Sequence, residues 1–583
     1  MRHILTTVTL ACLCAASPAL ATPAPARPPA LLDHRTLKPG AVLQGDTVFS
    51  RAGLEPFTAT VLAVMEDFLA PNEDLVLVKL GGPAVDKYGV VNGMSGSPVY
   101  LDGKLVGAVS YRFGTMPREP IAGVTPAESM MALLQHREKN PRKLTQAGPR
   151  LEGYGDAVPI ETPLVCGGCS DETIAAFGPR LRELGFTPVR GSGGATGTRF
   201  PVFPGGPIAA SFVDGDVSIS ALGTVTYVDG DRILAFGHQF EGMGDAEVMM
   251  GSAEVFGTIP SLANAHKVGR AGAVIGVWTE DRLVGIGGTL AQRARSVPFT
   301  MKLDRSEVLE AKRDLKFNVV DDTGLGAVMA QQAFHGALTN GTGHEDLGTI
   351  HLSGAVTLQD GRRVPLDDTF SSVPARTPTV STALHVGEIL ESLWRNPFER
   401  VRMKQVDFVV KQDVEPHLGM MVRSGVDKVR IHAGETLRAH VEVRTHREGL
   451  KRLSVEIPTD PWMEPGVYSV LFADGDEATT FDRDAGLVPY PQSLDEVVNI
   501  LTHRRRGDHL YVFLADRVKG ARVAGQPMPE LPPSMLAILN EGMEGPPAKK
   551  LARRALKVMS VDAGMMILGD AETTITVLAP RVR

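Results

Sequence analysis

Short apolar runs rich in β-branched residues recur between Gly45 and Tyr111, separated by glycine, proline, aspartate and asparagine. The runs DTVFS, FTATVLAVM, DLVLVKL, SPVYL and KLVGAVSY have the length of strands, and this spacing favours a small barrel or sandwich. A helix follows, for which Thr125 and Glu128 form a predicted capping box. The pattern therefore predicts a strand-rich module over residues 33–145.

A second strand-rich module is predicted over residues 150–300. The stretches SISALGTVTYVDGDRILAFGHQF and AVIGVWTEDRLVGIGG each place an aspartate-containing turn between two apolar runs, as hairpins require. Residues 301–404 mix strand patterns with the helical periodicity of ALHVGEILESLWRN. We interpret this third part as an α+β connecting region.

Strict alternation of apolar and polar residues begins after about residue 405. It predicts strands with one buried face. We expect these strands to form an immunoglobulin-like β-sandwich over residues 405–485. The alternating apolar positions are Leu437, Ala439, Val441 and Val443, followed by Leu453, Val455 and Ile457. Residues 486–583 predict a C-terminal α/β region with a capped helix at SLDEVVNIL and strands at HLYVFLA and TTITVLA.

The N-terminus has the features of a secretory signal peptide. An apolar run follows Arg2, and Ala19-Leu20-Ala21 has the small-x-small arrangement of a cleavage site, so residues 1–21 are expected to be removed. Residues 22–32, rich in proline and alanine, predict a linker. We therefore expect an exported protein, periplasmic or extracellular, with no stable membrane span after cleavage.

Composition narrows the classes of partner. The 583 residues carry a formal net charge of -7 with both signs interspersed, which offers no basic stripe for nucleic acid. Of four cysteines, two lie in the predicted signal peptide, and Cys166 and Cys169 in LVCGGCS are candidates for a short disulfide. One pair cannot complete a zinc site, and we expect no metal and no cofactor. The basic run HRRRG, residues 503–507, predicts a solvated turn.

Candidate chemistry lies in the segment GMSGSP. A serine is a poor nucleophile unless a base removes its proton and donors hold the oxyanion. The glycines around Ser95 permit a turn in which the N–H groups of Gly93 and Ser95 point at one spot, although a turn without chemistry fits the same spacing. The nucleophile elbow of α/β-hydrolases has the motif G-x-S-x-G at a turn from a strand to a helix. Here Ser97 stands at the position of the last glycine, and a hairpin follows instead of a helix, so this alternative is disfavoured.

Two longer segments resemble a known family. VVNGMSGSPVYLDGKLVGAV looks like the serine motif of the SpoIVB-type serine peptidases, and GTVTYVDGDRILAFGHQFEGMGDAEV, residues 223–248, looks like their histidine segment. The resemblance covers roughly residues 40–300. It implies a trypsin-like double β-barrel core, with Ser95 as nucleophile and His238 as general base.

This chain departs from the family pattern in two ways. The serine segment precedes the histidine segment, and no PDZ signature is apparent, so the resemblance implies a permuted order of the two barrels. No aspartate stands at the family's position for the catalytic acid, which leaves Asp86 or Asp74 as candidates. A triad depends on geometry and not on chain order.

The sequence supports two functional hypotheses. The first is an exported serine endopeptidase that cleaves a protein or peptide substrate in a limited, regulatory way. The second is a catalytically inactive pseudo-protease that binds a cell-envelope protein through the C-terminal sandwich. The fold class expected in both cases is mainly β, with a double β-barrel core, an α+β region and a β-sandwich.

Overall fold

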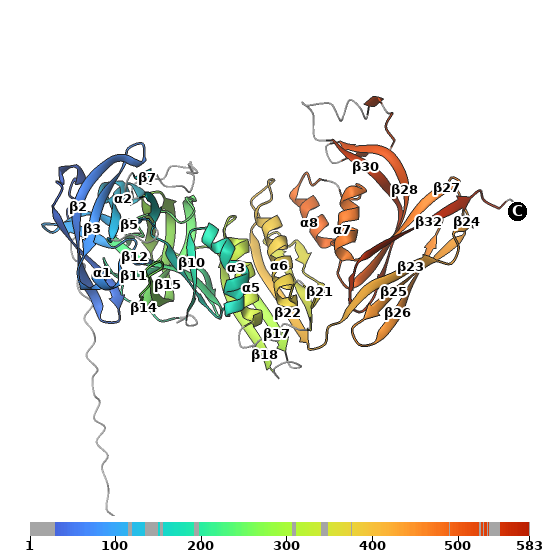
Figure 1. Ribbon diagram of the computed structural model, residues 1–583, viewed down its shortest axis with the longest axis horizontal. Coiled ribbons are helices and arrows are strands. Elements are labelled where there is room, and N and C mark those ends of the chain that lie inside the picture. The colour runs from blue at the N-terminus through green and yellow to red at the C-terminus, as the bar shows by residue number, and fades with distance from the viewer. Residues whose placement is uncertain are drawn as a thin grey trace, which may run out of the picture.

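A computed structural model describes most of the chain after the predicted signal peptide. It is mainly β, and its sheets follow one another along the long axis, from the N-terminal sheet in blue to the C-terminal sheets in orange and red (Figure 1). The described residues are 29–114, 119–134, 150–151, 155–191, 197–305, 311–339, 348–374, 376–488, 490–523, 526–528, 530–532, 534–535 and 548–581. The predicted signal peptide lies outside them.

The first sheet contains a closed ring of six strands. They pair in the order β1-β2-β3-β6-β5-β4, and β4 closes the ring by pairing with both β5 and β1. The strands of this sheet are β1 (Val42–Ser50), β2 (Gly53–Ala70), β3 (Glu73–Gly81), β4 (Pro98–Leu101), β5 (Lys104–Phe113), β6 (Ile121–Pro126), β7 (Arg150–Leu151) and β8 (Gly155–Pro159). The short helices are η1 (His34–Thr36), α1 (Pro83–Tyr88), α2 (Ala127–Met131) and η2 (Ala132–Leu134).

The hairpin expected after the serine segment is confirmed, and it joins β4 to β5. Asp102 and Gly103 have φ values of 49° and 75°, and Leu101 pairs with Lys104 across them. Two central residues with positive φ match the twist of a two-residue hairpin, and Asp-Gly tolerates that conformation. This hairpin fixes where the serine segment enters the sheet.

The second sheet contains another closed ring of six strands. They pair in the order β11-β12-β13-β16-β15-β14, and β11 closes the ring by pairing with both β14 and β12. The ring strands and the two strands beside them are β9 (Thr162–Gly167), β10 (Phe186–Gly191), β11 (Pro207–Gly215), β12 (Ser218–Asp229), β13 (Arg232–Ala235), β14 (Gly244–Ile259), β15 (His266–Arg282) and β16 (Gly285–Leu290). The two rings therefore have the same strand order. In each, the strands pair in the order first, second, third, sixth, fifth and fourth, counted along the chain.

The expected boundary near residue 300 does not interrupt the second sheet. A bulge between Ser211 and Val213 lets β11 pair with β14 on one side and with β18 further along, so the sheet continues beyond the ring. The added strands are β17 (Ser296–Arg305), β18 (Ala311–Val320), β19 (Thr349–Leu358), β20 (Arg363–Pro365), β21 (Asp368–Ser371) and β22 (Met403–Asp413). Its core is shared by the helices α3 (Asp171–Glu183), α5 (Gly326–Thr339), α6 (Pro378–Trp394) and α8 (Leu494–Thr502), of which α6 and α8 lie side by side in Figure 1.

The C-terminal part consists of two sheets around one core, and the expected boundary at residue 485 is wrong. Strands from residues 509–578 complete the sheets that begin before residue 485, because the core needs apolar faces from both segments. The strands are β23 (Leu418–Val426), β24 (Arg430–His432), β25 (Thr436–Thr445), β26 (Gly449–Pro458), β27 (Gly466–Ala473), β28 (His509–Val523), β29 (Gln526–Met528), β30 (Ala548–Asp562), β31 (Met566–Leu568) and β32 (Asp570–Leu578). The helix α7 (Gly475–Asp484) packs on these strands, whereas α8, which follows it in the chain, packs on the second sheet.

Two local predictions need correction. Thr125 does not cap a helix: the N-cap of α2 is Pro126, and the Thr125 hydroxyl instead donates to the Gly237 carbonyl at 2.7 Å. The end of the predicted linker is structured, because Leu32 and Leu105 are joined by a backbone hydrogen bond of 2.9 Å. Within the described part of the chain, every helix is too short or too polar to cross a bilayer.

Candidate active site at the junction of the two rings

Ser95 lies in a tight loop between α1 and β4. Gly93 and Gly96 have φ values of 91° and 93°, a conformation that suits glycine. The N–H groups of Met94, Gly96 and Ser97 donate to main-chain carbonyls at 3.0, 2.8 and 3.0 Å. Among the described residues, the N–H groups of Gly93 and Ser95 have no acceptor, so the serine loop contains two unused backbone donors.

His238 follows the end of β13 through a turn with positive φ at Phe236 (66°) and Gly237 (69°). Its Nδ1 lies 2.7 Å from the Gln239 carbonyl oxygen, which can only accept. Nδ1 therefore carries the proton, and Nε2 presents a lone pair. Burial lowers the pKa of this imidazole, and the backbone carbonyls of Gln239 and Ile160 oppose that shift without reversing it, so the ring is neutral at pH 7.

The two loops pack directly against each other. The Thr224 N–H donates to the Ser95 carbonyl at 3.0 Å, and the Thr226 hydroxyl donates to the Gly96 carbonyl at 2.7 Å. A Cβ added at Gly96 would lie 2.5 Å from the Phe236 nitrogen, so the serine loop touches the segment that leads to His238. The structure therefore brings the loop of Ser95 into contact with the segment that precedes His238, where the two rings meet.

Ser95 and His238 are both buried there, at 0% and 3% exposure. The Ser95 hydroxyl oxygen and His238 Nε2 have no hydrogen-bond partner within the described residues, so they are not bonded to each other. A buried polar atom without a partner costs about 1–3 kcal/mol, which makes two such atoms in adjoining loops a sign of function.

Neither predicted acid reaches His238. Asp86 is exposed on α1, and Asp74 is buried on β3, where its Oδ2 lies 2.8 Å from Nε2 of His34. The assignment of either residue as the catalytic acid is therefore not supported. The main-chain carbonyl of Gln239 occupies the place at Nδ1 that a carboxylate would take.

The sequence reasoning missed Asp281, a buried carboxylate at the end of β15. It accepts the N–H groups of Phe240, Glu241 and Met243 at 2.8, 3.1 and 3.1 Å, and so fixes the loop that follows His238. Burial raises the pKa of this carboxyl, and the backbone donors oppose that shift. The sequence does place Asp281 in the predicted hairpin VWTEDRLVG. Only the fold, however, brings its carboxylate to the loop that follows His238.

The sequence reasoning also missed Lys267, a buried lysine behind the serine loop. It is 1% exposed, and its Nζ donates to the hydroxyls of Thr47 and Thr224 at 2.9 and 3.1 Å. Thr224 in turn donates to the Gly93 carbonyl at 3.0 Å. The lysine thus anchors one peptide of the serine loop through a threonine.

We predict a stability signature for Lys267. Burial lowers its pKa from 10.5 to about 7, so the unfolded chain binds more protons than the folded chain between these values. The free energy of unfolding should rise through this window by up to about 1.4 kcal/mol per pH unit, relative to Lys267→Met. Urea midpoints at pH 7 and pH 9 measure this slope, and exposed Lys104→Met is the control. Equal slopes in the native protein and Lys267→Met would contradict the assignment.

The predicted disulfide candidates are paired in the structure. Cys166 and Cys169 are bonded to each other, with Cα atoms 5.6 Å apart, at the end of β9. Cys169 contacts α5, since a Cβ added at Gly336 would lie 3.1 Å from its sulfur. The pair therefore belongs to the packing of α5 on the sheet and not to the serine site.

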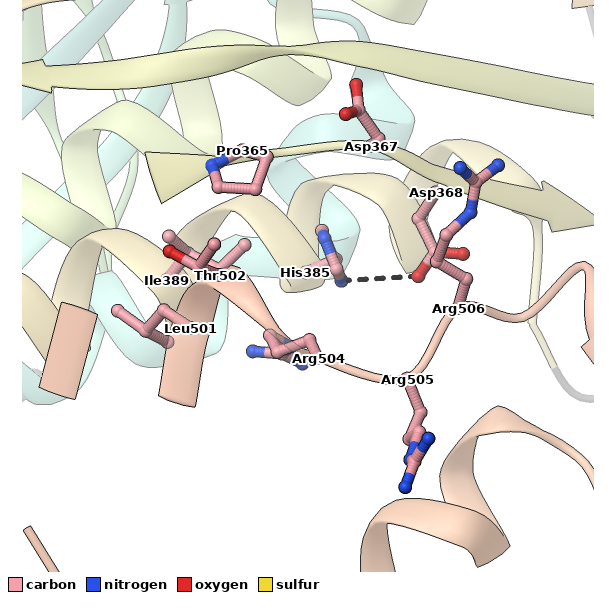
Figure 2. A pocket seen from close by; sticks show the side chains of 10 residues that line it. All are labelled: Pro365, Asp367, Asp368, His385, Ile389, Leu501, Thr502, Arg504, Arg505 and Arg506. Atoms are coloured by element: carbon pink, nitrogen blue, oxygen red, sulfur yellow. Dashed lines mark ion pairs between the residues drawn. The ribbon is translucent and has the colours of Figure 1, made fainter. Parts of the chain in front are cut away.

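The basic run at residues 503–507 lines a pocket and is not merely a solvated turn. Figure 2 shows Arg504 and Arg506 near His385 and Asp368, whereas the Arg505 side chain points away from them. Burial lowers the pKa of His385 to about 3 and raises that of Asp368 to about 6. The arginines are bound to Glu388, Asp482 and Asp508 respectively. Since Glu388 lies on α6 and the Gly507 N–H donates to Asp368 of β21 at 2.7 Å, the run joins the second sheet to the C-terminal part.

Comparison with known protein families, curated proteins and solved structures finds no match to this chain.

Proposed function

We propose that this protein is a serine endopeptidase whose two strand rings are the barrels of a trypsin-like core. The observation that carries the proposal is the group of unpartnered polar atoms in the two adjoining loops: the Ser95 hydroxyl, His238 Nε2 and the N–H groups of Gly93 and Ser95. The identical strand order of the rings supports it. So does the resemblance of both segments to the SpoIVB-type peptidases.

The proposed reaction uses these atoms in named roles. The Ser95 oxygen attacks the scissile carbonyl carbon, and its proton passes to His238 Nε2. The N–H groups of Gly93 and Ser95 hold the oxyanion that forms, a contribution worth about 10²–10³ in turnover per donor. His238 returns the proton to the leaving amine, and water then releases the acyl group. Asp281 acts as a positioning residue through the loop after His238.

Burial of the site bears on how the peptidase would be used. Since Ser95 is 0% exposed, a substrate reaches it only when the surrounding loops move. A closed resting site suits limited, regulated cleavage of a protein better than digestion. We place this activity outside the cytoplasm, on the strength of the signal-like N-terminus, with the C-terminal sheets available to an envelope partner.

A second function is favoured by the same burial. A pseudo-protease would keep the rings as a scaffold and bind a cell-envelope protein through the C-terminal sheets. The lack of a carboxylate on His238 Nδ1 supports this alternative, because the described partners that stabilise the imidazolium are the backbone carbonyls of Gln239 and Ile160.

Labelling with a fluorophosphonate probe tests the peptidase. We expect the full chain lacking residues 1–21 to be labelled, and Ser95→Ala to abolish labelling. Ser97→Ala is the matched control: Ser97 is equally buried, but its hydroxyl is bound to the Met94 carbonyl and Thr47. Equal labelling of the native protein and Ser95→Ala would reject Ser95. Absence of labelling in folded protein would favour either a zymogen-like closed resting state or the pseudo-protease.

A further inference from the structure

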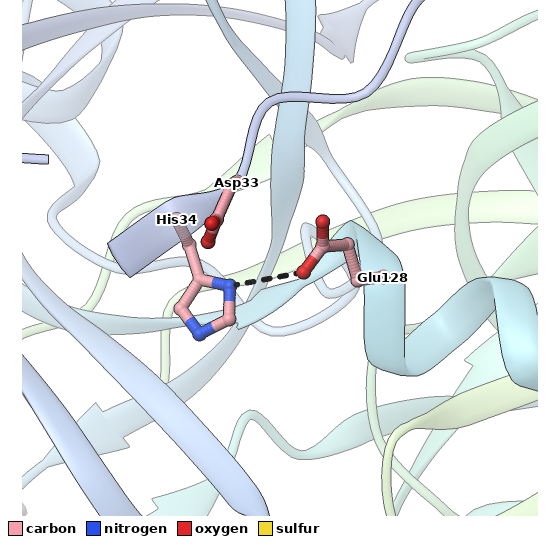
Figure 3. Close-up of side chains that lie close together, drawn as sticks. All are labelled: Asp33, His34 and Glu128. Carbon is pink, nitrogen blue, oxygen red and sulfur yellow. Dashed lines mark ion pairs between the residues drawn. The ribbon is translucent and has the colours of Figure 1, made fainter. Parts of the chain in front are cut away.

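Three metal-ligating side chains meet on the first sheet, away from the serine loop. Figure 3 shows Asp33, His34 and Glu128 facing one another, with His34 on η1 and Glu128 on α2. One ligand atom from each lies within 4.8 Å of the others, and His34 Nδ1 is 3.8 Å from a Glu128 carboxylate oxygen. Asp33 and His34 are neighbours in the sequence, whereas Glu128 is far from both, and this spacing matches no known metal-binding motif. Only the fold therefore brings Glu128 into the group.

The imidazole of His34 is oriented as a metal ligand requires. Its Nε2 lies 2.8 Å from the Asp74 carboxylate, which fixes the proton on Nε2 and leaves a lone pair on Nδ1. His34 is 3% exposed, and Nδ1 has no hydrogen-bond partner among the described residues. Metal-bound histidines characteristically donate their other N–H to a carboxylate, which sets the tautomer and raises ligand basicity.

The charge around this nitrogen favours a cation. Asp33, Glu128 and Asp74 contribute three carboxylates, whereas the nearby cation Arg35 is largely exposed and reaches Asp74 at 3.4 Å, on the far side of the imidazole. Asp33 uses one oxygen to accept the Arg35 N–H as the N-cap of η1, and its other oxygen remains available.

We propose that Asp33, His34 and Glu128 bind one Zn²⁺ ion, with water completing the coordination. One imidazole nitrogen and two carboxylate oxygens suit Zn²⁺, whereas Ca²⁺ and Mg²⁺ select sites built from oxygen alone. Ligand atoms around tetrahedral zinc lie about 3.4 Å apart, so small rotations of the two exposed carboxylates complete the site. The ion would tie η1 to α2 and so fasten the segment that pairs with β5 at Leu105.

Zinc titration of the full chain lacking residues 1–21, after chelator treatment, tests this site by calorimetry and by thermal unfolding. Asp33→Asn and Glu128→Gln are the informative variants, since both residues are exposed and asparagine still caps η1. We expect the native protein to bind zinc and to unfold at a higher temperature with it. Each variant should lose at least about 10-fold in affinity and most of the thermal shift, because losing even an outer partner of a metal site costs about 10–100-fold.

Glu119→Gln is the matched control: Glu119 is an exposed glutamate just before β6 that pairs with Lys79, and its loss should leave zinc affinity unchanged. Zinc affinity that is equal in the native protein and in both variants would overturn the assignment, as would a native protein that gains no thermal shift from zinc. Equal stabilisation by Ca²⁺ or Mg²⁺ would overturn the choice of zinc. Fluorophosphonate labelling does not enter this test, so its outcome is independent of the proposed function.

Discussion

Gly96→Ala is expected to destabilise the protein by about 2–5 kcal/mol and to disconnect the serine loop from the second ring. The φ of 93° costs an alanine about 1–2 kcal/mol, and the added Cβ would lie 2.1 Å from the Thr224 carbonyl oxygen. That oxygen belongs to backbone and cannot rotate away, so overpacking adds about 1–3 kcal/mol. Urea unfolding gives the free energy, and hydrogen exchange of the β4 and β5 amides locates the change.

Gly40→Ala separates the two causes. Gly40 has a φ of 88°, but nothing lies within 4 Å of its added Cβ, so this variant carries the conformational strain without the collision. We expect Gly96→Ala to cost clearly more than Gly40→Ala. Equal losses would show that the serine loop is not held against Thr224 and Phe236, and the proposed junction would then be wrong.

His238→Ala is expected to slow fluorophosphonate labelling of Ser95 by about 10²–10⁴-fold, which is the usual contribution of a general base. In the native protein the labelling rate should be constant above pH 6.5 and fall only under more acidic conditions. The sign follows from burial, which lowers the pKa of His238 and keeps Nε2 unprotonated until the pH drops below the ordinary histidine value. Rates measured from pH 4 to pH 9 give this profile.

His335→Gln is the control for the loss of a buried histidine. His335 is fully buried on α5, burial lowers its pKa to about 4, and its Nδ1 lies 2.9 Å from the Thr173 hydroxyl. The variant should lose stability yet keep the acidic limb of the labelling profile. If His238→Ala labels at the native rate while remaining folded, His238 is not the base.

Elements with one repeated local pattern were predictable. Leu437, Ala439, Val441 and Val443 alternate along β25, and all four are 0% exposed, as the period of two predicts. Ser493 caps α8 by accepting the Glu496 N–H at 3.2 Å, as its position at the start of SLDEVVNIL indicates. Both results follow from forces between residues near in sequence.

The ends of domains were not predictable from pattern. The boundary set at residue 485 failed because β31 and β32 pair with β23 and β27, strands that lie about 100 residues or more earlier in the chain. Each strand shows its own buried face in the sequence, but nothing local says which earlier strand will cover that face. The same limit hid the bulge in β11 that joins the second ring to β18.

The sequence by itself determined the mainly β class, the glycine turn around Ser95 and the identity of Ser95 and His238 as candidates. Only the tertiary structure decided that these two loops meet, that Asp86 and Asp74 stand away from His238, and that Asp281 supports the histidine loop. The same holds for the buried amine of Lys267 and for the approach of Glu128 to His34. Turn and strand propensities act within a few residues, whereas burial and polar contacts between distant segments exist only once the rings have closed.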